Sequence, residues 1–129
     1  MALVTFLVED NKTIRENLIP VLEDMADAQV VGFAETESAA AHWLRENGEG
    51  WHLAVVDMFL KEGSGLGVLR SCANRARHQR VVVLTNYATD DMRERCLALK
   101  ADAVFDKSNQ IDDFIDYCTR RWASQFGSL

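Results

Sequence analysis

Short apolar runs alternate along this chain with longer segments in which apolar residues recur every three or four positions. This spacing predicts strands in the short runs and helices in the longer segments. The expected strands cover residues 3–8, 29–33, 53–56, 81–84 and 103–105. The first, third and fourth lack the polar alternation of a half-exposed strand, and the second has the polar flank of an edge strand. The order is typical of βαβ units around a parallel sheet.

The first predicted helix runs from about Lys12 to Met25. The segment Thr13-Ile14-Arg15-Glu16 matches a capping box and predicts how this helix starts. Pro20 predicts a kink in it, because proline lacks the amide that would bond to the carbonyl of Glu16.

Four more helices are expected to follow the remaining strands. They begin near Thr36, after the glycine-bearing stretch 63–67, at Thr89 and at Ser108. Thr89 is a favourable N-cap, and the two aspartates after it suit the helix dipole. The 129 residues therefore predict one α/β domain, 1–129, with a core from about 3 to 123 and a short tail, 124–129.

Composition excludes several classes of protein. The net charge of -6 argues against a nucleic-acid surface, which needs a clustered basic face. No apolar run approaches membrane-spanning length, and no basic start precedes an apolar signal segment. The three cysteines Cys72, Cys96 and Cys118 lie in helical apolar patterns and predict buried, reduced thiols. We expect a cytoplasmic protein without a membrane partner.

Polar residues follow four of the expected strands. Glu9 and Asp10 follow the first, Asp57 the third, Thr85 the fourth, and Lys107 stands two residues after the fifth. Because parallel strands end at the same edge of a sheet, these side chains are expected to meet in one pocket. An isolated acid at a strand end would more often cap a helix, but the ordered set indicates a functional site.

The residue types predict a divalent cation. Mg²⁺ prefers octahedral oxygen ligands and keeps several waters, so a few carboxylates make its usual protein site. Asp10 and Asp57 are expected to bind it directly, Glu9 through a water, and the backbone carbonyl of Phe59 adds another oxygen; Mn²⁺ is an alternative ion.

The same pocket suits phosphoryl transfer. A carboxylate can attack phosphorus and form an aspartyl phosphate, a reaction that depends mainly on positioning and charge neutralisation. Asp57 is the expected nucleophile, because it ends the central strand and faces the other groups. The Lys107 ammonium and the Thr85 hydroxyl are expected to contact the phosphoryl oxygens.

These motifs together resemble the receiver domain of two-component response regulators. The resemblance runs from about Val4 to Trp122 and rests on Glu9-Asp10, Asp57-Met58-Phe59-Leu60 with Gly65, Leu84-Thr85, and Phe105-Asp106-Lys107. It implies a flavodoxin-like (βα)5 three-layer sandwich with strand order 2-1-3-4-5. It also implies Mg²⁺-dependent phosphorylation of Asp57 by a histidine kinase or phosphotransfer protein. Thr85 would then move toward the phosphoryl group and alter the surface around the fourth helix and fifth strand.

Four positions depart from the family pattern. Lys61 replaces a frequent proline, which changes the stiffness of its loop and adds a charge at the pocket mouth. Asn86 replaces a small residue and narrows access to the phosphoryl group. Ser108 replaces the proline after Lys107, so we expect a trans bond there and a helix cap at Ser108, since a cis bond would cost about 3 kcal/mol.

The fourth departure concerns the switch aromatic that the family carries three residues before its lysine. That position is Val104 here, and Phe105 should alternate to the opposite face of the sheet. Two bulky rings, Phe59 and Tyr87, should line the pocket rim and hinder the water that hydrolyses the phosphoryl group. The alternative is that both rings simply pack on the surface.

Other function classes stay open as alternatives. A degenerate receiver would act as a protein-binding module without phosphorylation. An aspartate-nucleophile phosphatase or phosphotransferase would need a second aspartate where Phe59 stands, and a flavin site would need a hydroxyl- and glycine-rich loop where Glu9-Asp10-Asn11-Lys12 stands. The favoured reading is a stand-alone, non-enzymatic receiver that acts on an unknown protein target, with its oligomeric state, including a dimer, undetermined.

Overall fold

The computed structural model describes residues 3–122, without the side chains of Met25, Arg121 and Trp122. The predicted tail, 124–129, lies outside the described residues. The strands are β1 (Leu3–Val8), β2 (Ala28–Ala34), β3 (Leu53–Val56), β4 (Arg80–Thr85) and β5 (Ala103–Asp106). The helices are α1 (Lys12–Met25), α2 (Glu37–Asn47), α3 (Gly65–Ser71), α4 (Asp90–Ala98) and α5 (Ile111–Trp122).

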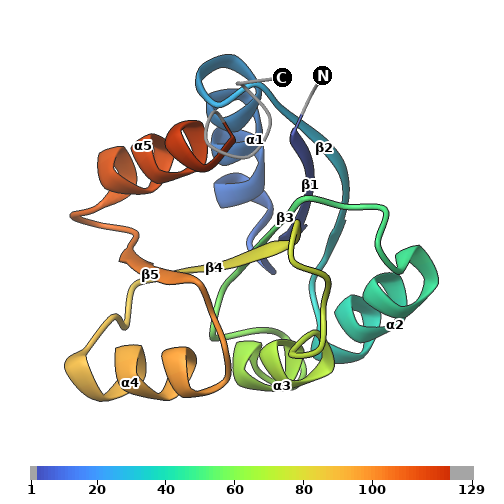
Figure 1. Cartoon of the computed structure of the whole chain (residues 1–129). Coiled ribbons are helices and arrows are strands. Elements are labelled where there is room, and N and C mark those ends of the chain that lie inside the picture. The colour runs from blue at the N-terminus through green and yellow to red at the C-terminus, as the bar shows by residue number, and fades with distance from the viewer. Residues whose placement is uncertain (1–2, 123–129) are drawn as a thin grey trace.

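All strand pairs are parallel, and the sheet order is β2-β1-β3-β4-β5. Helices α1 and α5 cover one face, and α2, α3 and α4 cover the other (Figure 1). The flavodoxin-like three-layer sandwich and the edge position of β2 are therefore confirmed. In the register of the central strands Val8 pairs with Val56 and Val56 with Val83, so β1 and β3 end at one level and β4 continues beyond it to Thr85.

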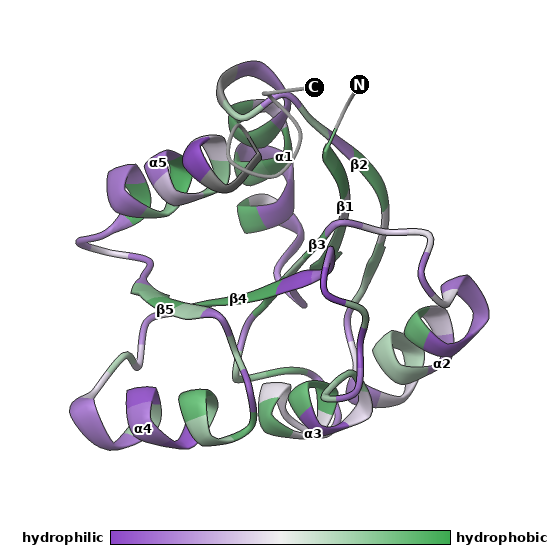
Figure 2. Cartoon of the chain, viewed as in Figure 1, coloured by the Kyte–Doolittle hydropathy of each residue, from purple (hydrophilic) through white to green (hydrophobic). Residues whose placement is uncertain are grey.

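Each face of the sheet has its own apolar core. On the α2–α4 side the core includes Phe6, Val56 and Val104, and on the α1–α5 side it includes Leu7 and Phe114. Figure 2 shows the green, hydrophobic strands between helices that carry purple on their outer sides. This two-sided burial explains why the central strands are continuously apolar.

The two neighbouring residues of β5 face opposite cores. Val104 is 7% exposed in the α2–α4 core, whereas Phe105 packs on the α1–α5 side. The Phe105 ring lies 5.9 Å from that of Phe114 and 5.6 Å from that of Tyr117, measured between centroids. The predicted alternation at Phe105 is confirmed.

Helix α1 has the expected bounds but a different start. The side chain of Asn11 accepts a hydrogen bond from the Ile14 amide at 3.0 Å, so Asn11 is the N-cap. The expected capping box at 13–16 is wrong, because Asn11, two residues before Thr13, caps the helix and Glu16 pairs with Lys12 instead at 3.8 Å. Pro20 lies inside the helix, and the kink stays a prediction.

The predicted starts of the other helices are partly confirmed and partly wrong. Thr89 caps α4 as predicted, and α2 starts next to Thr36 as predicted, with Thr36 as its N-cap. The expectation that α5 begins at Ser108 is wrong, since the helix begins at Ile111. The reason is local: the Asp106 carboxylate accepts hydrogen bonds from the amides of Ser108 (2.7 Å) and Asn109 (3.1 Å), which favours a turn over a helix.

The three cysteines are free and buried, as predicted. Burial raises the pKa of Cys118 to about 12, which keeps this thiol protonated and unreactive. None of the helices in the described part of the chain is long and apolar enough to cross a membrane.

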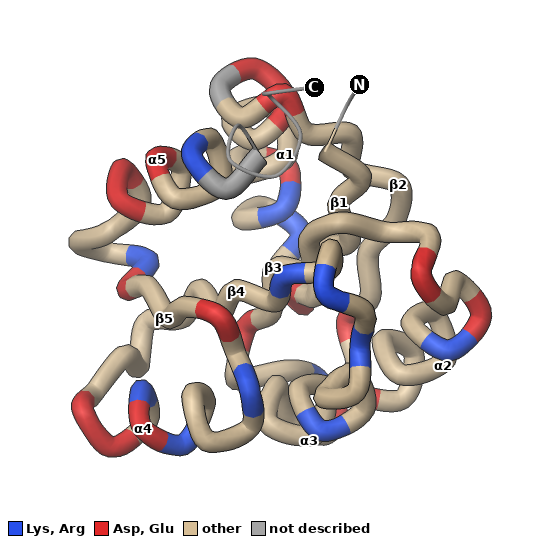
Figure 3. Tube along the Cα trace, viewed as in Figure 1, with Lys and Arg blue, Asp and Glu red and all other residues tan. Residues whose placement is uncertain are grey.

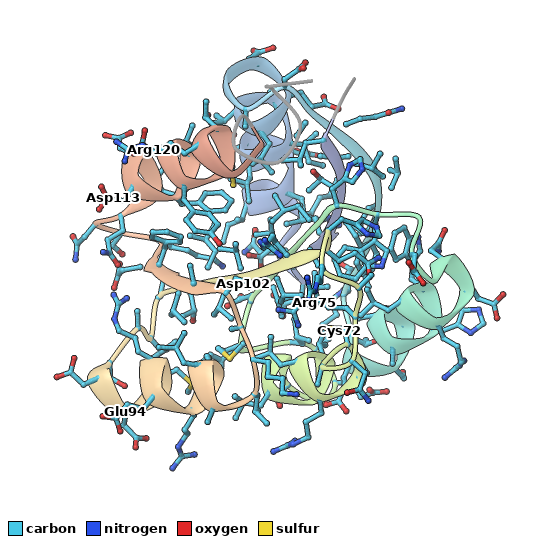
Figure 4. All side chains as sticks on the ribbon, viewed as in Figure 1. Cys72, Arg75, Glu94, Asp102, Asp113 and Arg120 are labelled. Atoms are coloured by element: carbon cyan, nitrogen blue, oxygen red, sulfur yellow. The ribbon has the colours of Figure 1, made fainter. Side chains whose placement is uncertain are left out.

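The basic stretch between α3 and β4 is partly structural. Figure 3 shows several blue positions along this segment. Arg75 donates to Asp102 at 2.8 Å, to the Lys100 carbonyl at 2.6 Å and to the Gln79 carbonyl at 3.1 Å. Arg75 and Asp102 are labelled next to each other in Figure 4. This arginine therefore joins the segment before β4 to the segment before β5.

Candidate functional site

Four of the five polar residues predicted to meet at the carboxyl ends of the strands lie close together, namely Glu9, Asp10, Asp57 and Lys107. Glu9 and Asp10 follow β1, Asp57 follows β3, Thr85 ends β4 and Lys107 follows β5. One carboxylate oxygen each of Glu9, Asp10 and Asp57 lies within 4.8 Å of the others. This separation suits a single cation such as Mg²⁺, because oxygen ligands lie about 2 Å from the ion and therefore within a few ångströms of one another.

Lys107 is the counter-charge of this acid cluster. Its ammonium donates to Glu9 Oε1 at 2.5 Å and to Asp57 Oδ2 at 3.0 Å. The side chains of Lys107 and Asp57 are each 11% exposed and that of Glu9 is 3% exposed. Three carboxylates thus face one ammonium in a largely dry pocket, which leaves an excess of negative charge.

The shifted pKa values follow from this arrangement. Burial raises the pKa of Glu9 above its ordinary value, and the contact with Lys107 only partly offsets the effect. For Lys107 burial acts downward, but the hydrogen bond to Glu9 and the charges of Asp57 and Glu9 outweigh it and raise the pKa. Lys107 is therefore firmly an ammonium, while Glu9 lies in a site that disfavours its charge.

The Asp57 carboxylate is held in one orientation. Its Oδ1 accepts from the Met58 amide at 2.8 Å while Oδ2 takes the Lys107 contact, and its own amide donates to the Val8 carbonyl at 3.0 Å. Gly65 lets the following loop close over this strand end. A Cβ at position 65 would overlap the Asp57 carbonyl oxygen and the Met58 side chain.

The loop after Asp57 (residues 58–64, the β3–α3 loop) is fastened to the start of α2. The amide of Lys61 donates to the Glu35 carbonyl at 3.3 Å, and its ammonium pairs with the Glu35 carboxylate at 3.2 Å. The Ser64 amide donates to Glu37 Oε1 at 2.9 Å. Lys61 was predicted to add a charge at the pocket mouth. In the structure its ammonium forms an ion pair with Glu35.

Glu35 has a second partner that sequence reasoning missed. Arg15 on α1 donates to its carboxylate at 2.9 Å and to the Glu9 carbonyl at 2.8 Å, while its guanidinium lies 4.1 Å from the Phe33 ring centroid. The hydrogen bond from Arg15, followed by that from Lys61, lowers the pKa of Glu35. In the sequence Arg15 stands among the polar residues of a helix, with nothing to distinguish it from a solvated arginine.

Thr85 ends β4, the strand next to β3, which Asp57 follows. It is fully buried, its hydroxyl accepts from the Tyr87 amide at 3.2 Å, and its carbonyl accepts from the Lys107 amide at 3.0 Å. The peptide bond between Lys107 and Ser108 is trans, as expected. Ser108 does not cap a helix; its hydroxyl lies 3.3 Å from Asn86 Oδ1, on the segment that follows Thr85.

The two expected rim aromatics lie against each other. Phe59 is 52% exposed and Tyr87 is 57% exposed, and their ring centroids are 4.4 Å apart. They come from the loops after Asp57 and after Thr85, so the pair joins the two sides of the pocket.

Comparison with known proteins agrees with this geometry. The family model of the response regulator receiver domain matches residues 5–119. A curated relative is the DNA-binding transcriptional activator DevR/DosR of Mycobacterium tuberculosis, 31% identical over 86 residues. That match covers 67% of this chain and 39% of the relative, so the chain spans well under half of that protein.

Solved structures share the fold at low sequence identity. The response regulator domain of Thermotoga maritima CheB is 16% identical with a TM-score of 0.80, and the match covers 98% of each chain. The phosphorylated cyanobacterial phytochrome response regulator RcpA is 20% identical with a TM-score of 0.77, covering 100% of this chain and 97% of that one. The Mn²⁺-bound form of Rcp1 is 22% identical with a TM-score of 0.69, covering 93% and 91%. With the family model matched over residues 5–119, this chain belongs to the response regulator receiver domain family of two-component signalling.

Proposed function

We propose that the chain is a phosphorelay receiver in which Asp57 accepts a phosphoryl group in a Mg²⁺-dependent reaction. The observation that carries the proposal is the contact of the Lys107 ammonium with both Asp57 and Glu9, beside a third acid, Asp10. The excess of carboxylates over ammonium groups in this pocket favours an additional cation, and a phosphoryl group is stabilised by positive charge around its oxygens.

The donor set fits magnesium. Three carboxylate oxygens within 4.8 Å of one another are hard ligands of the kind that Mg²⁺ and Mn²⁺ bind. Asp10 and Asp57 would hold the ion directly, Glu9 through a water, and the Phe59 carbonyl would supply a further oxygen. When bound, the ion supplies positive charge beside the phosphoryl oxygens.

The protein's own residues perform the remaining tasks. The Met58 amide and Lys107 hold the Asp57 carboxylate so that one oxygen can attack phosphorus in line with the leaving group. The phosphorus–oxygen bond to Asp57 forms as the bond to the donor's leaving atom breaks. Lys107 would then neutralise the transferred oxygens, and the Thr85 hydroxyl, which accepts a hydrogen bond from the Tyr87 amide, would donate to one of them.

The donor is proposed to be a histidine kinase or phosphotransfer protein. Beside Lys107 the surface carries an apolar groove of about 350 Å³ between α1 and α5. Its lining includes Ile14, Leu18, Val21 and Ile111. Such a groove can bury apolar side chains of a partner close to the phosphoacceptor. We further propose a cytoplasmic protein, with the chain 1–129 as one domain that acts through an unidentified protein target.

We propose a switch and not an enzyme that converts a substrate. Members of this family are switches, and an aspartate phosphatase would need an acid where the exposed ring of Phe59 stands. The degenerate-receiver alternative makes a clear opposite prediction, since it expects no phosphoryl adduct.

The test is mass spectrometry of the chain after incubation with Mg²⁺ and acetyl phosphate, a small phosphodonor. We expect one added phosphoryl group, absent in Asp57→Asn and absent when a chelator removes the ion. Asp112→Asn, at an exposed acid in the first turn of α5, is the matched control and should be phosphorylated normally. An unmodified wild-type chain, or an adduct that persists in Asp57→Asn, would refute the proposal.

A further inference from the structure

Arg93 on α4 joins three segments that the sequence keeps apart. Its Nε donates to the Ala88 carbonyl at 3.1 Å, Nη1 to the Val104 carbonyl at 2.7 Å, and Nη2 to Gln110 Oε1 at 2.6 Å. These acceptors lie in the loop after Thr85 (residues 86–89, the β4–α4 loop), in β5 and directly before α5. Glu94, the next residue of α4, points into solvent (Figure 4).

The contact with Gln110 reaches further into the chain. The same Oε1 accepts from the Asp106 amide at 2.9 Å, the Gln110 amide donates to the Asp106 carbonyl at 2.8 Å, and its carbonyl accepts from the Phe114 amide at 2.9 Å. A displacement of Arg93 would therefore act on both the end of β5 and the first turn of α5.

The position of these contacts matters because Val104 replaces the family's switch aromatic. The valine side chain is buried in the α2–α4 core and has no hydroxyl or ring that could follow Thr85. The carbonyl of the same residue, however, is bound by Arg93. The backbone at position 104 is thus connected to the β4–α4 loop by a side chain from α4.

A guanidinium transmits displacement better than a flexible contact does. It is planar, and its donors stand in a fixed fork, so one acceptor cannot move far without breaking or shifting the other bonds. The three acceptors are neutral oxygens, and the hydrogen bonds are charge-assisted. A shift of the Ala88 carbonyl would therefore act on the contacts of Arg93 with Val104 and Gln110 as well.

Resting on the proposed function, we propose that Arg93 is the positioning residue that couples the β4–α4 loop to β5 and α5 when Asp57 is phosphorylated. Arg93 would perform the coupling role that the resemblance assigns to an aromatic side chain at position 104. A movement of Thr85 toward the phosphoryl group displaces residues 86–89, the Ala88 carbonyl moves with them, and the fork carries this displacement to Val104 and Gln110.

The test records amide chemical shifts of the whole chain by NMR with Mg²⁺ and beryllofluoride, an anion that binds an aspartate carboxylate in place of a phosphoryl group. In the wild type we expect shifts in residues 86–89, 104–106 and 110–114. In Arg93→Lys, which keeps the charge but loses the fork, the shifts in 86–89 should persist and those in 104–106 and 110–114 should be lost. Arg95→Lys is the matched control on the same helix, since Arg95 contacts Asp91 at 3.0 Å, and should behave as the wild type.

A second variant keeps the inference testable if Arg93→Lys does not fold. Gln110→Leu removes one branch of the fork and the bond to the Asp106 amide, so it should lose the shifts in 110–114 and retain the shift at Val104. Shifts of wild-type size throughout Arg93→Lys, or an unchanged pattern in Gln110→Leu, would overturn the coupling role. The fluorine NMR signal of bound beryllofluoride separates the two proposals. A wild type that binds the anion but shows no shifts in 104–114 refutes the role of Arg93, whereas a wild type that binds none refutes the proposed function and the role built on it.

Discussion

Replacing Lys107 with methionine tests the electrostatics of the pocket most directly. The substitution keeps a long side chain but removes the ammonium that contacts Glu9 at 2.5 Å and Asp57 at 3.0 Å. At an effective dielectric constant of about 20, each close pair of unit charges attracts by about 4 kcal/mol. The variant loses two such attractions but also avoids the cost of desolvating the lysine, which is several kcal/mol. We therefore expect a loss of about 3 kcal/mol in the free energy of unfolding without a divalent cation.

Magnesium should restore most of that loss. A ligand that binds only the native state adds about 2.7 kcal/mol at about a hundredfold excess over its dissociation constant. The variant retains all three carboxylates, Glu9, Asp10 and Asp57, and so presents more uncompensated charge to the ion than the wild type does. Its stabilisation by Mg²⁺ should accordingly exceed that of the wild type.

The assay is urea unfolding with and without Mg²⁺, followed by far-UV circular dichroism. Lys12→Met is the matched control, because Lys12 is 79% exposed and its contact with Glu16 measures 3.8 Å. A surface pair of this kind contributes little, so the control should keep the wild-type midpoint. A Lys107→Met variant as stable as the control, or one that Mg²⁺ fails to stabilise, would refute the reasoning.

Three other predictions concern different parts of the molecule. Phe59→Asn and Tyr87→Glu should each speed the loss of the phosphoryl group by opening the rim to water, as measured by decay of the phosphoprotein; unchanged rates would contradict this. Gly65→Ala should destabilise the fold by about 2 kcal/mol, because a Cβ overlaps the strand end before it, and an unchanged urea midpoint would show that the loop yields. Burial and then the charge of His78 lower the pKa of His52 below 6.5, so its contribution to stability is complete above about pH 6.5 and is lost as the pH falls through the folded-state value. His52→Gln should flatten the stability profile below pH 6.5, and equal slopes in both proteins would contradict the assignment.

The strands and the site could be predicted from sequence for the same physical reason. A buried parallel strand must be apolar on both faces, so its bounds are visible as an apolar run, and β1 and β3 have the expected ends. Once the runs are parallel strands, their carboxyl ends share an edge. Asp57 and Lys107, fifty residues apart, therefore meet without any contact having been assumed.

Helix starts were less predictable because several neighbouring side chains can make the same bond. Asn11 and Thr13 are both good caps, and the one nearer the strand end bonds to the free amide. Asp106 and Ser108 are likewise two candidate caps. In the structure the Asp106 carboxylate accepts hydrogen bonds from two backbone amides and forms a turn. The sequence lists the candidates, but the exact end of the strand decides between them.

The ion pairs of Glu35 beside the pocket could not be predicted. Glu35 meets Lys61 and Arg15 because two loops and a helix converge, and those partners are 26 and 20 residues away along the chain. Long charged side chains on helices and loops normally extend into solvent, so nothing in their spacing signals a partner.

These contacts hold the two sides of Asp57 differently. The β3–α3 loop is tied to the start of α2 through Glu35, Lys61 and Glu37, with backbone bonds in both directions. The β4–α4 loop is tied to β5 and α5 through the guanidinium of Arg93 and the Ser108 hydroxyl. A displacement that begins at the phosphoryl group meets a loop fixed by several backbone and ionic contacts on one side, and side-chain contacts that can shift as a unit on the other. If Arg93 acts as proposed, we expect the displacement to be carried through α4 and β5, even though the residue at position 104 is a valine.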